Sequence, residues 1–257
     1  MKFSIITVVR NRVDTVEKAI LSVLSQRHPD VEYIIIDGQS TDGTLAILKS
    51  YEPRVAHLVS EKDRGLYDAL NKGIALATGD MVGFLHADDF YPNPEILSQV
   101  NAQLEHDHPA AVLTDIVYVD RHREKIVRRF YSAKGWNPKR FSYGWMPPHP
   151  GAFIPLRAYQ TWGVFQIDYR IAADYELLVR FFYTHRLSFK YLPLVSVHMR
   201  QGGTSTRNLQ SVWVLNREII RACAENGIRT SWLKLALKFP LKILELFKRP
   251  KLQSPTP

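Results

Sequence analysis

The fold is decided by the stretch Met81-Val82-Gly83-Phe84-Leu85-His86-Ala87-Asp88-Asp89-Phe90-Tyr91-Pro92. Its first five residues are apolar and predict a strand, which runs into the acidic pair Asp88-Asp89. Adjacent carboxylates at a strand end repel each other and lose hydration, and a bound divalent cation removes both penalties. We therefore expect a site for a metal ion and a diphosphate at the carboxyl end of this strand, where open α/β sheets bind ligands. An acidic pair that only caps the next helix fits the same residues.

Strands and helices alternate on the amino-terminal side of this stretch. Apolar runs predict strands at 3–9, 31–36 and 55–60. Helical spacing predicts helices at 15–26, from about Thr41 or Asp42 to Tyr51, and at 67–77. Such alternation is typical of βαβ units, which form a parallel sheet. Asp37, which follows the second strand, should therefore open onto the same edge of the sheet as the acidic pair.

The carboxyl-terminal half shows a different pattern. Further strands are expected at 111–118, 125–131, 152–154 and 189–197, and helices at 173–184 and 209–225. Residues 136–150 combine proline, glycine and aromatic residues, which predicts a loop that packs through large side chains.

Composition narrows the class of protein. The chain has 257 residues, a formal net charge of +9 and a single cysteine, Cys223. The charge indicates an anionic partner, which nucleic acid, acidic phospholipid and nucleotide phosphates all satisfy. One cysteine excludes an internal disulfide and fits a reducing compartment. The first apolar segment is predicted to be a strand and not a signal peptide. No apolar run reaches the roughly 20 residues that span a bilayer. We therefore expect a cytoplasmic protein.

Two further polar segments follow expected strands. Residues 37–44 combine Asp37, two glycines and a helix start, an arrangement that suits a base or a ribose, although a capped turn explains it equally well. Residues 63–73 place Arg64, Asp68 and Asn71 at the start of a helix, and the alternative is a solvated helix start.

These segments occur in the order found in family 2 inverting glycosyltransferases, which have the GT-A fold, and the chain resembles that family over about its first 200 residues. It is particularly similar to bacterial enzymes that assemble exopolysaccharide or O-antigen repeat units. The resemblance implies an α/β GT-A fold with a Rossmann-like, mostly parallel central sheet flanked by helices. It implies a nucleotide-sugar-binding part at 1–110 and an acceptor-binding part at 111–228.

The resemblance also implies roles for individual residues on the donor side. Asp88 and Asp89 would hold Mn²⁺ or Mg²⁺, with Asp89 preferred as the direct ligand. Asp37 would bind the base, and this task falls to Asp37 alone because Gly38 replaces a second Asp that many members have. The remaining contacts to the nucleotide sugar would come from Thr7, Asn11, Arg64, Asp68, Asn71, His86 and Arg200, with Arg64 and Arg200 near the diphosphate.

The acceptor side requires a carboxylate that takes the proton of the attacking hydroxyl. Asp174, at a helix start that resembles a later acidic motif of the family, is the predicted catalytic base, and N-capping is the alternative. Glu176 is expected to be structural and to form a surface pair with Arg180. His149 is predicted on the acceptor side unless it is simply packed. His198 is a second candidate contact beside Arg200, and a surface turn is the alternative for both.

The tail at 229–251 is predicted to be a basic amphipathic helix, with 252–257 disordered. Lys234, Lys238 and Lys242 recur every four residues among apolar residues, which suits a helix in the interface of an anionic membrane. The alternative is packing on the domain or on a second subunit. A membrane location at the inner face of the cytoplasmic membrane would serve a lipid-linked acceptor.

The predicted function is therefore an inverting, metal-dependent glycosyltransferase that moves a sugar from a nucleoside-diphosphate-sugar to a hydroxyl of a lipid-linked saccharide in cell-surface polysaccharide biosynthesis. A nucleotidyltransferase is the first alternative, but the first strand lacks the glycine- and basic-rich phosphate loop that it would need. A nucleic-acid-binding protein is the second, but much of the excess positive charge lies in the tail.

Overall fold

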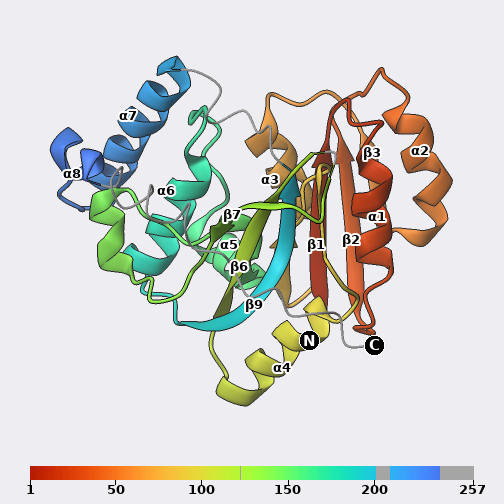
Figure 1. The fold of residues 1–257 in the computed structure, drawn as a ribbon, viewed down its shortest axis with the longest axis horizontal. Coiled ribbons are helices and arrows are strands. Elements are labelled where there is room, and N and C mark those ends of the chain that lie inside the picture. Colours follow the sequence, from red (N-terminus) through yellow and green to blue (C-terminus); the bar gives the residue numbers. More distant parts are fainter. Residues whose placement is uncertain (122, 201–208, 238–257) are drawn as a thin grey trace.

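The computed structural model describes residues 1–121, 123–200 and 209–237, which form a central sheet covered by helices on both faces (Figure 1). The strand β1 (Phe3–Val9) shows why both faces are covered. Ile6 and Val8 belong to one hydrophobic core, whereas Ile5 and Val9 belong to the other. Successive side chains of a strand point to opposite faces, so a strand that is apolar throughout must be buried on both sides.

Four parallel strands form the amino-terminal part of the sheet. They are β1, β2 (Val31–Asp37), β3 (His57–Ser60) and β4 (Met81–Phe84). Strand β1 pairs in parallel with both β2 and β4, and β2 pairs with β3. The predicted parallel sheet is confirmed here, although β3 begins two residues later than expected because 52–54 form a 3₁₀ turn.

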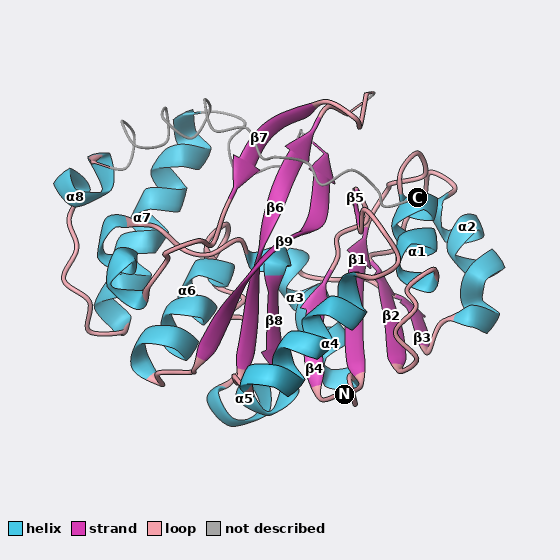
Figure 2. Cartoon of the chain, turned by 60° about the horizontal axis from the view of Figure 1, so that its bottom comes forward, coloured by secondary structure: helices cyan, strands magenta, loops and turns pink. Residues whose placement is uncertain are grey.

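The second half of the sheet is mixed. It contains β5 (Asp89–Phe90), β6 (Ala111–Val119), β7 (Val127–Tyr131), β8 (Ala152–Pro155) and β9 (Phe189–Arg200). Within the described residues the strand order is β3-β2-β1-β4-β8-β6-β9-β5, with β7 paired to β6 (Figure 2). Strand β8 is antiparallel to both β4 and β6, so it joins the parallel half to the rest of the sheet.

The helices are divided between the two faces. They are α1 (Val16–Leu24), α2 (Thr44–Tyr51), α3 (Leu66–Leu76), α4 (Ile96–Asp107), α5 (Leu156–Trp162), α6 (Ala173–Val179), α7 (Leu209–Glu225) and α8 (Trp232–Ala236). Helices α3, α5 and α6 contribute to the core on one face and α1 and α4 to the core on the other, while α7 packs on α6. Helices α7 and α8 lie at one end of the molecule and α1 and α2 at the other (Figure 1).

Several expectations for helices need correction. The N-cap position of α2 is occupied by Gly43, whose φ of +98° suits glycine, and not by Thr41 or Asp42, although Asp42 Oδ1 accepts a hydrogen bond from the Thr44 amide at 3.0 Å. Helices α4 and α5 were not predicted, and α5 follows β8 without an intervening turn. No helix in the described part of the chain is both long and apolar enough to cross a membrane. Most of the predicted basic helix (238–251) and the tail 252–257 lie outside the described residues.

Candidate functional site

The parallel strands bring the predicted donor-side segments to one edge of the sheet. In the register of β1 and its neighbours, Val9 lies opposite Asp37, and Ile6 lies opposite Phe84, the last residue of β4. The turns that follow β1, β2 and β4 therefore open onto the same edge. This confirms the expectation that Asp37 and the acidic pair open onto the same edge of the sheet.

The acidic pair combines a buried and a half-exposed carboxylate. Asp89 is 1% exposed, and its Oδ2 atom has no hydrogen-bond partner. Burial and the negative charge of Asp88 raise the pKa of Asp89 well above its ordinary value. A buried carboxylate oxygen without a partner is costly, and a cation would offset that cost.

These two carboxylates fit a divalent metal ion. Among the described residues no three His, Cys, Asp or Glu side chains gather as a ready-made metal site. Mg²⁺ is commonly bound by one or two carboxylates that share it with substrate phosphates, so a pair of carboxylates suffices if the donor supplies the other ligands. The pair Asp88-Asp89 meets that requirement.

Arg200 is fixed directly behind the acidic turn. Its Nη1 donates to the Asp88 carbonyl oxygen at 2.7 Å, and its Nε and Nη2 donate to Glu124 Oε1 at 2.9 and 2.5 Å. Lys18 also pairs with Glu124, and its Nζ lies 4.0 Å from the centre of the Phe90 ring. Arg200 ends strand β9, so the surface-turn alternative is wrong for this residue. Lys18 and Glu124 were missed because they lie far from Arg200 in sequence.

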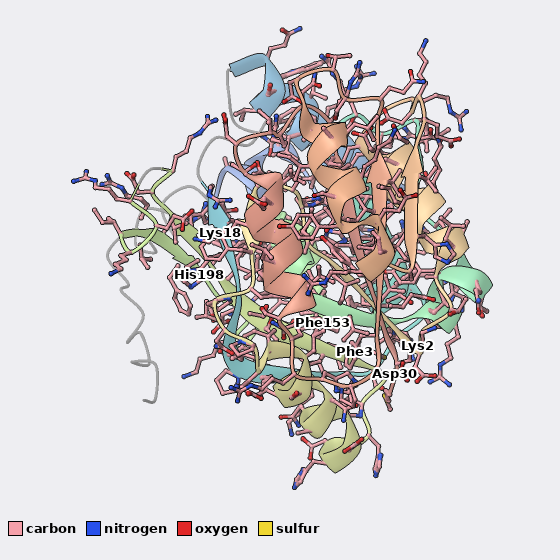
Figure 3. The ribbon with its side chains drawn as sticks, turned by 90° about the vertical axis from the view of Figure 1, so that its right-hand side faces the viewer. Lys2, Phe3, Lys18, Asp30, Phe153 and His198 are labelled. Carbon is pink, nitrogen blue, oxygen red and sulfur yellow. The ribbon has the colours of Figure 1, made fainter. Side chains whose placement is uncertain are left out.

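His198 lies on the same side of the molecule as Lys18 (Figure 3). Its ring meets the Phe90 ring edge-on, with centroids 5.3 Å apart. Burial and the nearby Lys18 lower the pKa of His198 to about 4, so the ring is neutral at physiological pH. His86, in the turn after β4, is half-buried, and burial lowers its pKa as well.

Asp37 organises the loop in which it lies. It is fully buried, and its carboxylate accepts hydrogen bonds from the hydroxyls of Ser40 at 2.5 Å and Ser60 at 2.6 Å. A Cβ on Gly38 would overlap the carboxylate of Asp63, so Asp63 takes the space of the second Asp that the resemblance places at position 38. Neither the serines nor Asp63 were predicted, since their proximity depends on the folded loops.

Asn11 and Thr7 also make contacts within the protein. Asn11 has a φ of +53°, and its Oδ1 accepts a hydrogen bond from the Thr41 amide at 2.8 Å, which ties the loop after β1 to the loop after β2. Thr7 is fully buried, and its hydroxyl donates to the Leu85 carbonyl at 2.7 Å. Contact of Thr7 and Asn11 with a nucleotide stays a prediction.

Helix α3 carries a second group of predicted residues. Arg64 Nη2 donates to Asp68 Oδ1 at 2.8 Å, and hydrogen bonds from Arg64 lower the pKa of Asp68. Asn71 does not present a free amide, because its side chain donates to the Phe165 carbonyl at 2.8 Å and accepts from the Phe165 amide at 2.9 Å. Asn71 therefore attaches the loop before α6 to α3.

A cavity of about 310 Å³ separates the start of α3 from that loop. It is lined by residues 64–68 and 167–170. This volume lies at the small end of the range for small-molecule sites. The Tyr67 hydroxyl, at the cavity, donates to the Ile171 carbonyl and so joins its two walls.

Asp174 lies in the first turn of α6, three residues beyond Ile171. Burial raises its pKa from 3.8 to about 6, and its Oδ1 accepts a hydrogen bond from the Tyr175 amide at 2.8 Å. Ala172 occupies the N-cap position of α6, so Asp174 is not the N-cap residue, although its carboxylate bonds an amide of the first turn. A carboxylate with a pKa near 6 is ionised at neutral pH and is a stronger base than an ordinary Asp.

Two other predicted residues are buried. His149 is 5% exposed and stacks on Phe84 with ring centroids 5.0 Å apart, and burial lowers its pKa to about 3. The packed alternative describes it in this structure. Glu176 and Arg180 form a two-bond pair with both bonds 2.9 Å long, but this pair is buried and not on the surface as expected.

Comparisons with known proteins agree with this architecture. Residues 4–157 match the model of the family described as glycosyl transferase family 2. An uncharacterized glycosyltransferase of Mycobacterium tuberculosis (strain H37Rv) is 34% identical over 186 residues, which cover 69% of this chain and 67% of the relative. A PGL/p-HBAD biosynthesis glycosyltransferase of the same strain is 29% identical over 204 residues, covering 78% and 77% of the two chains.

Solved structures show the same fold. Residues 1–349 of TarS from S. aureus, in complex with UDP-GlcNAc, align with a TM-score of 0.68 at 18% identity, over 93% of this chain and 69% of that one. The mannosyltransferase PcManGT from Pyrobaculum calidifontis, in complex with GDP-Man and Mn²⁺, aligns with a TM-score of 0.59 at 19% identity, over 96% and 81%. The expected α/β fold with a central sheet flanked by helices is confirmed.

Proposed function

The chain belongs to glycosyl transferase family 2, and from that premise we propose that it transfers a sugar from a nucleoside-diphosphate-sugar to a hydroxyl of a saccharide acceptor, with inversion at the anomeric carbon. The buried Asp89 oxygen without a partner, at the carboxyl edge of the parallel strands, carries this proposal. The family match favours a glycosyltransferase over both a nucleotidyltransferase and a nucleic-acid-binding protein.

On the donor side, Asp88 and Asp89 would hold Mn²⁺ or Mg²⁺. Such an ion neutralises the charge that develops on the diphosphate as it leaves. Arg12 and Arg64 carry exposed guanidinium groups at this edge, and Arg12 Nε lies 3.9 Å from Asp88 Oδ2. Both can bind phosphate oxygens, which guanidinium groups match in geometry. Relatives of known structure are described with UDP-GlcNAc or with GDP-Man and Mn²⁺, which supports a nucleotide-sugar donor.

On the acceptor side, Asp174 would act as the catalytic base. The acceptor hydroxyl oxygen attacks the anomeric carbon while its proton passes to the Asp174 carboxylate. The bond between that carbon and the diphosphate oxygen breaks in the same step, and the nucleoside diphosphate leaves. Direct displacement from the opposite face inverts the anomeric configuration, so an α-linked donor gives a β-linked product.

The acceptor is proposed to be a lipid-linked saccharide used for a cell-surface glycan. The name of one relative places that protein in PGL/p-HBAD biosynthesis. In this chain, Trp232, Leu233 and Leu237 are 50%, 75% and 54% exposed, and the sequence that follows contains Lys238, Lys242, Lys248, Arg249 and Lys251. Exposed apolar residues beside basic ones suit binding at the inner face of the cytoplasmic membrane.

Calorimetric titration tests the donor site. We expect one class of UDP- or GDP-sugar to bind in the presence of Mn²⁺ and to bind at least about tenfold more weakly to Asp89→Ala. Glu105→Ala, which changes an exposed carboxylate on α4, is the control and should bind like the wild type. A folded wild-type protein that binds no nucleotide sugar with or without Mn²⁺ would contradict the proposal.

A further inference from the structure

One carboxylate holds the backbone that leads into Asp174. Glu218, on α7, accepts three hydrogen bonds from consecutive amides, with its Oε1 bound to Arg170 N at 2.7 Å and its Oε2 bound to Ile171 N at 2.9 Å and Ala172 N at 2.8 Å. These amides lie two to four residues before Asp174. A carboxylate that accepts several amide hydrogen bonds makes strong, charge-assisted contacts.

The same face of α7 fixes the preceding residues. Arg221 Nη2 lies 2.5 Å from Asp168 Oδ2, and its guanidinium lies 4.3 Å from the centre of the Tyr169 ring. Glu225 accepts a hydrogen bond from the Tyr169 hydroxyl at 2.6 Å. Positions 218, 221 and 225 recur on one side of a helix, so a single helix face holds the whole segment 168–172.

Helix α7 is itself firmly attached to α6. Ala222 and Cys223 are fully buried, and the Tyr175 hydroxyl, next to Asp174 in sequence, lies 3.5 Å from Cys223 Sγ. The two helices run beside each other at the end of the molecule away from α1 (Figure 1). Glu218 therefore links α7 to the segment that leads into α6.

We propose that Glu218 is the positioning residue for Asp174, holding the backbone of 170–172 in place and setting a second negative charge close to the reacting carboxylate. This inference rests on the proposed role of Asp174 as the base. It extends that role, because it assigns the geometry and the charge environment of the base to a residue 44 positions away in sequence.

The electrostatic environment of Asp174 agrees with this assignment. Two titratable groups influence the pKa of Asp174: Tyr67 from α3, whose hydroxyl lowers it, and Glu218 from α7, whose negative charge raises it. Burial is the largest contribution to the raised pKa of Asp174, and Glu218 adds to it. Removing the charge of Glu218 should therefore lower the pKa of Asp174.

The variant Glu218→Gln separates positioning from simple loop support. Carboxyl ¹³C NMR of labelled Asp, with Asp174→Asn to assign the resonance, should show an Asp174 midpoint near pH 6 in the wild type. In Glu218→Gln we expect that midpoint to fall by about half a unit or more. Glu225→Gln, on the same helix face but bound to a side chain, should leave the midpoint unchanged.

Transfer rates complete the test. With the donor found by calorimetry, Glu218→Ala should lower kcat about tenfold or more while the affinity for the donor stays within about twofold, because a misplaced base slows the reaction without affecting the donor site. A folded Glu218→Gln protein with wild-type kcat and an unchanged Asp174 midpoint would overturn the inference. If Glu218→Ala fails to fold, the midpoint in Glu218→Gln decides alone.

The failure of the proposed base is distinguishable from the failure of this inference. If Asp174→Asn keeps the wild-type transfer rate, Asp174 is not the base, and the positioning role of Glu218 falls with it. If Asp174→Asn is inactive but Glu218→Gln leaves both the midpoint and kcat unchanged, only the role of Glu218 is overturned.

Discussion

At the scale of single residues, two buried carboxylates at the same edge of the sheet differ in one respect that suits them to different roles. Asp37 has its oxygens occupied by Ser40 and Ser60, whereas Asp89 keeps one oxygen without a partner. A fully bonded buried carboxylate stabilises the loop around it. An unsatisfied one is costly to the fold and is suited to a cation. This difference suits Asp37 to holding its loop and Asp89 to binding a metal ion, while contact of Asp37 with the base stays a prediction.

This difference predicts opposite effects on stability. Asp37→Ala removes the buried acceptor that the hydroxyls of Ser40 and Ser60 share and should lower the free energy of unfolding by about 2 kcal/mol. Metal-free Asp89→Asn should be at least as stable as the wild type at pH 7. The reason is that a carboxyl whose pKa is raised in the folded state costs stability once the pH exceeds the pKa of that carboxyl in the unfolded chain. Urea denaturation in EDTA checks both, and a marked loss in Asp89→Asn would contradict the assignment.

The raised pKa of Asp174 predicts a pH dependence of the reaction. The base must be ionised, so log(kcat/KM) should rise by about one per pH unit below pH 6 and level off above it. The raised pKa also means that the folded protein favours the protonated form of Asp174. This preference stabilises the fold below the unfolded pKa of 3.8, and the stabilisation is lost as the pH rises through about 6. Initial rates between pH 4.5 and 8 check the profile, and a flat profile from pH 5 to 7 would contradict it.

At the scale of elements, α3 joins the donor half to the acceptor half. Its Tyr67 donates to Ile171, and its Asn71 makes two hydrogen bonds to Phe165. Phe165 in turn contacts Phe84, the last residue of β4, with ring centroids 5.6 Å apart. The strand that leads to the acidic pair and the loop that leads to Asp174 are therefore held at a fixed separation by one helix.

Removing the Asn71 amide should loosen this connection. Asn71→Ala leaves the backbone of Phe165 without its partners and should cost about 1–3 kcal/mol. Hydrogen exchange should accelerate at 163–172 more than in the parallel strands, since the loop loses its attachment while the sheet keeps its own. Gln99→Ala, an exposed position on α4, is the control. Equal exchange in the two variants would show that Asn71 does not hold the loop.

At the scale of the whole molecule, the features that could be predicted from the sequence depend on local patterns. The features that could not be predicted depend on contacts between distant segments. Strands β1, β2 and β4 and the common edge of Asp37 and Asp89 followed from apolar runs and alternation alone. Helix α5 could not be found, because seven residues directly after a strand carry too little periodicity. The antiparallel insertion of β8 between β4 and β6 depends on pairing between distant segments.

The residues of the candidate site also divide into those that the sequence could indicate and those that it could not. Asp89 and Asp174 stand out because a carboxylate at a strand end or a helix start can be recognised locally. Glu218, Glu124 and Asp63 act only through folded contacts with residues distant in sequence, so no spacing signals them. His149 and Asn71 suit a site by residue type, and in this structure His149 packs against Phe84 while Asn71 bonds the backbone of Phe165, so their contact with a substrate stays a prediction.

The arrangement of the molecule also predicts how it meets its acceptor. Helices α7 and α8 lie together, and α7 holds the segment before Asp174, so a membrane bound at α8 would bring a lipid-linked saccharide to the base.

The wild type should co-sediment with vesicles that contain anionic lipid and should be released by salt. Leu233→Glu should weaken this binding about tenfold, because it places a charge on a side chain that is 75% exposed. Leu21→Glu, at the opposite end on α1, should bind like the wild type. Equal binding of both variants would contradict the membrane role of α8, and a dimer that Leu233→Glu dissociates would assign this surface to a second subunit instead.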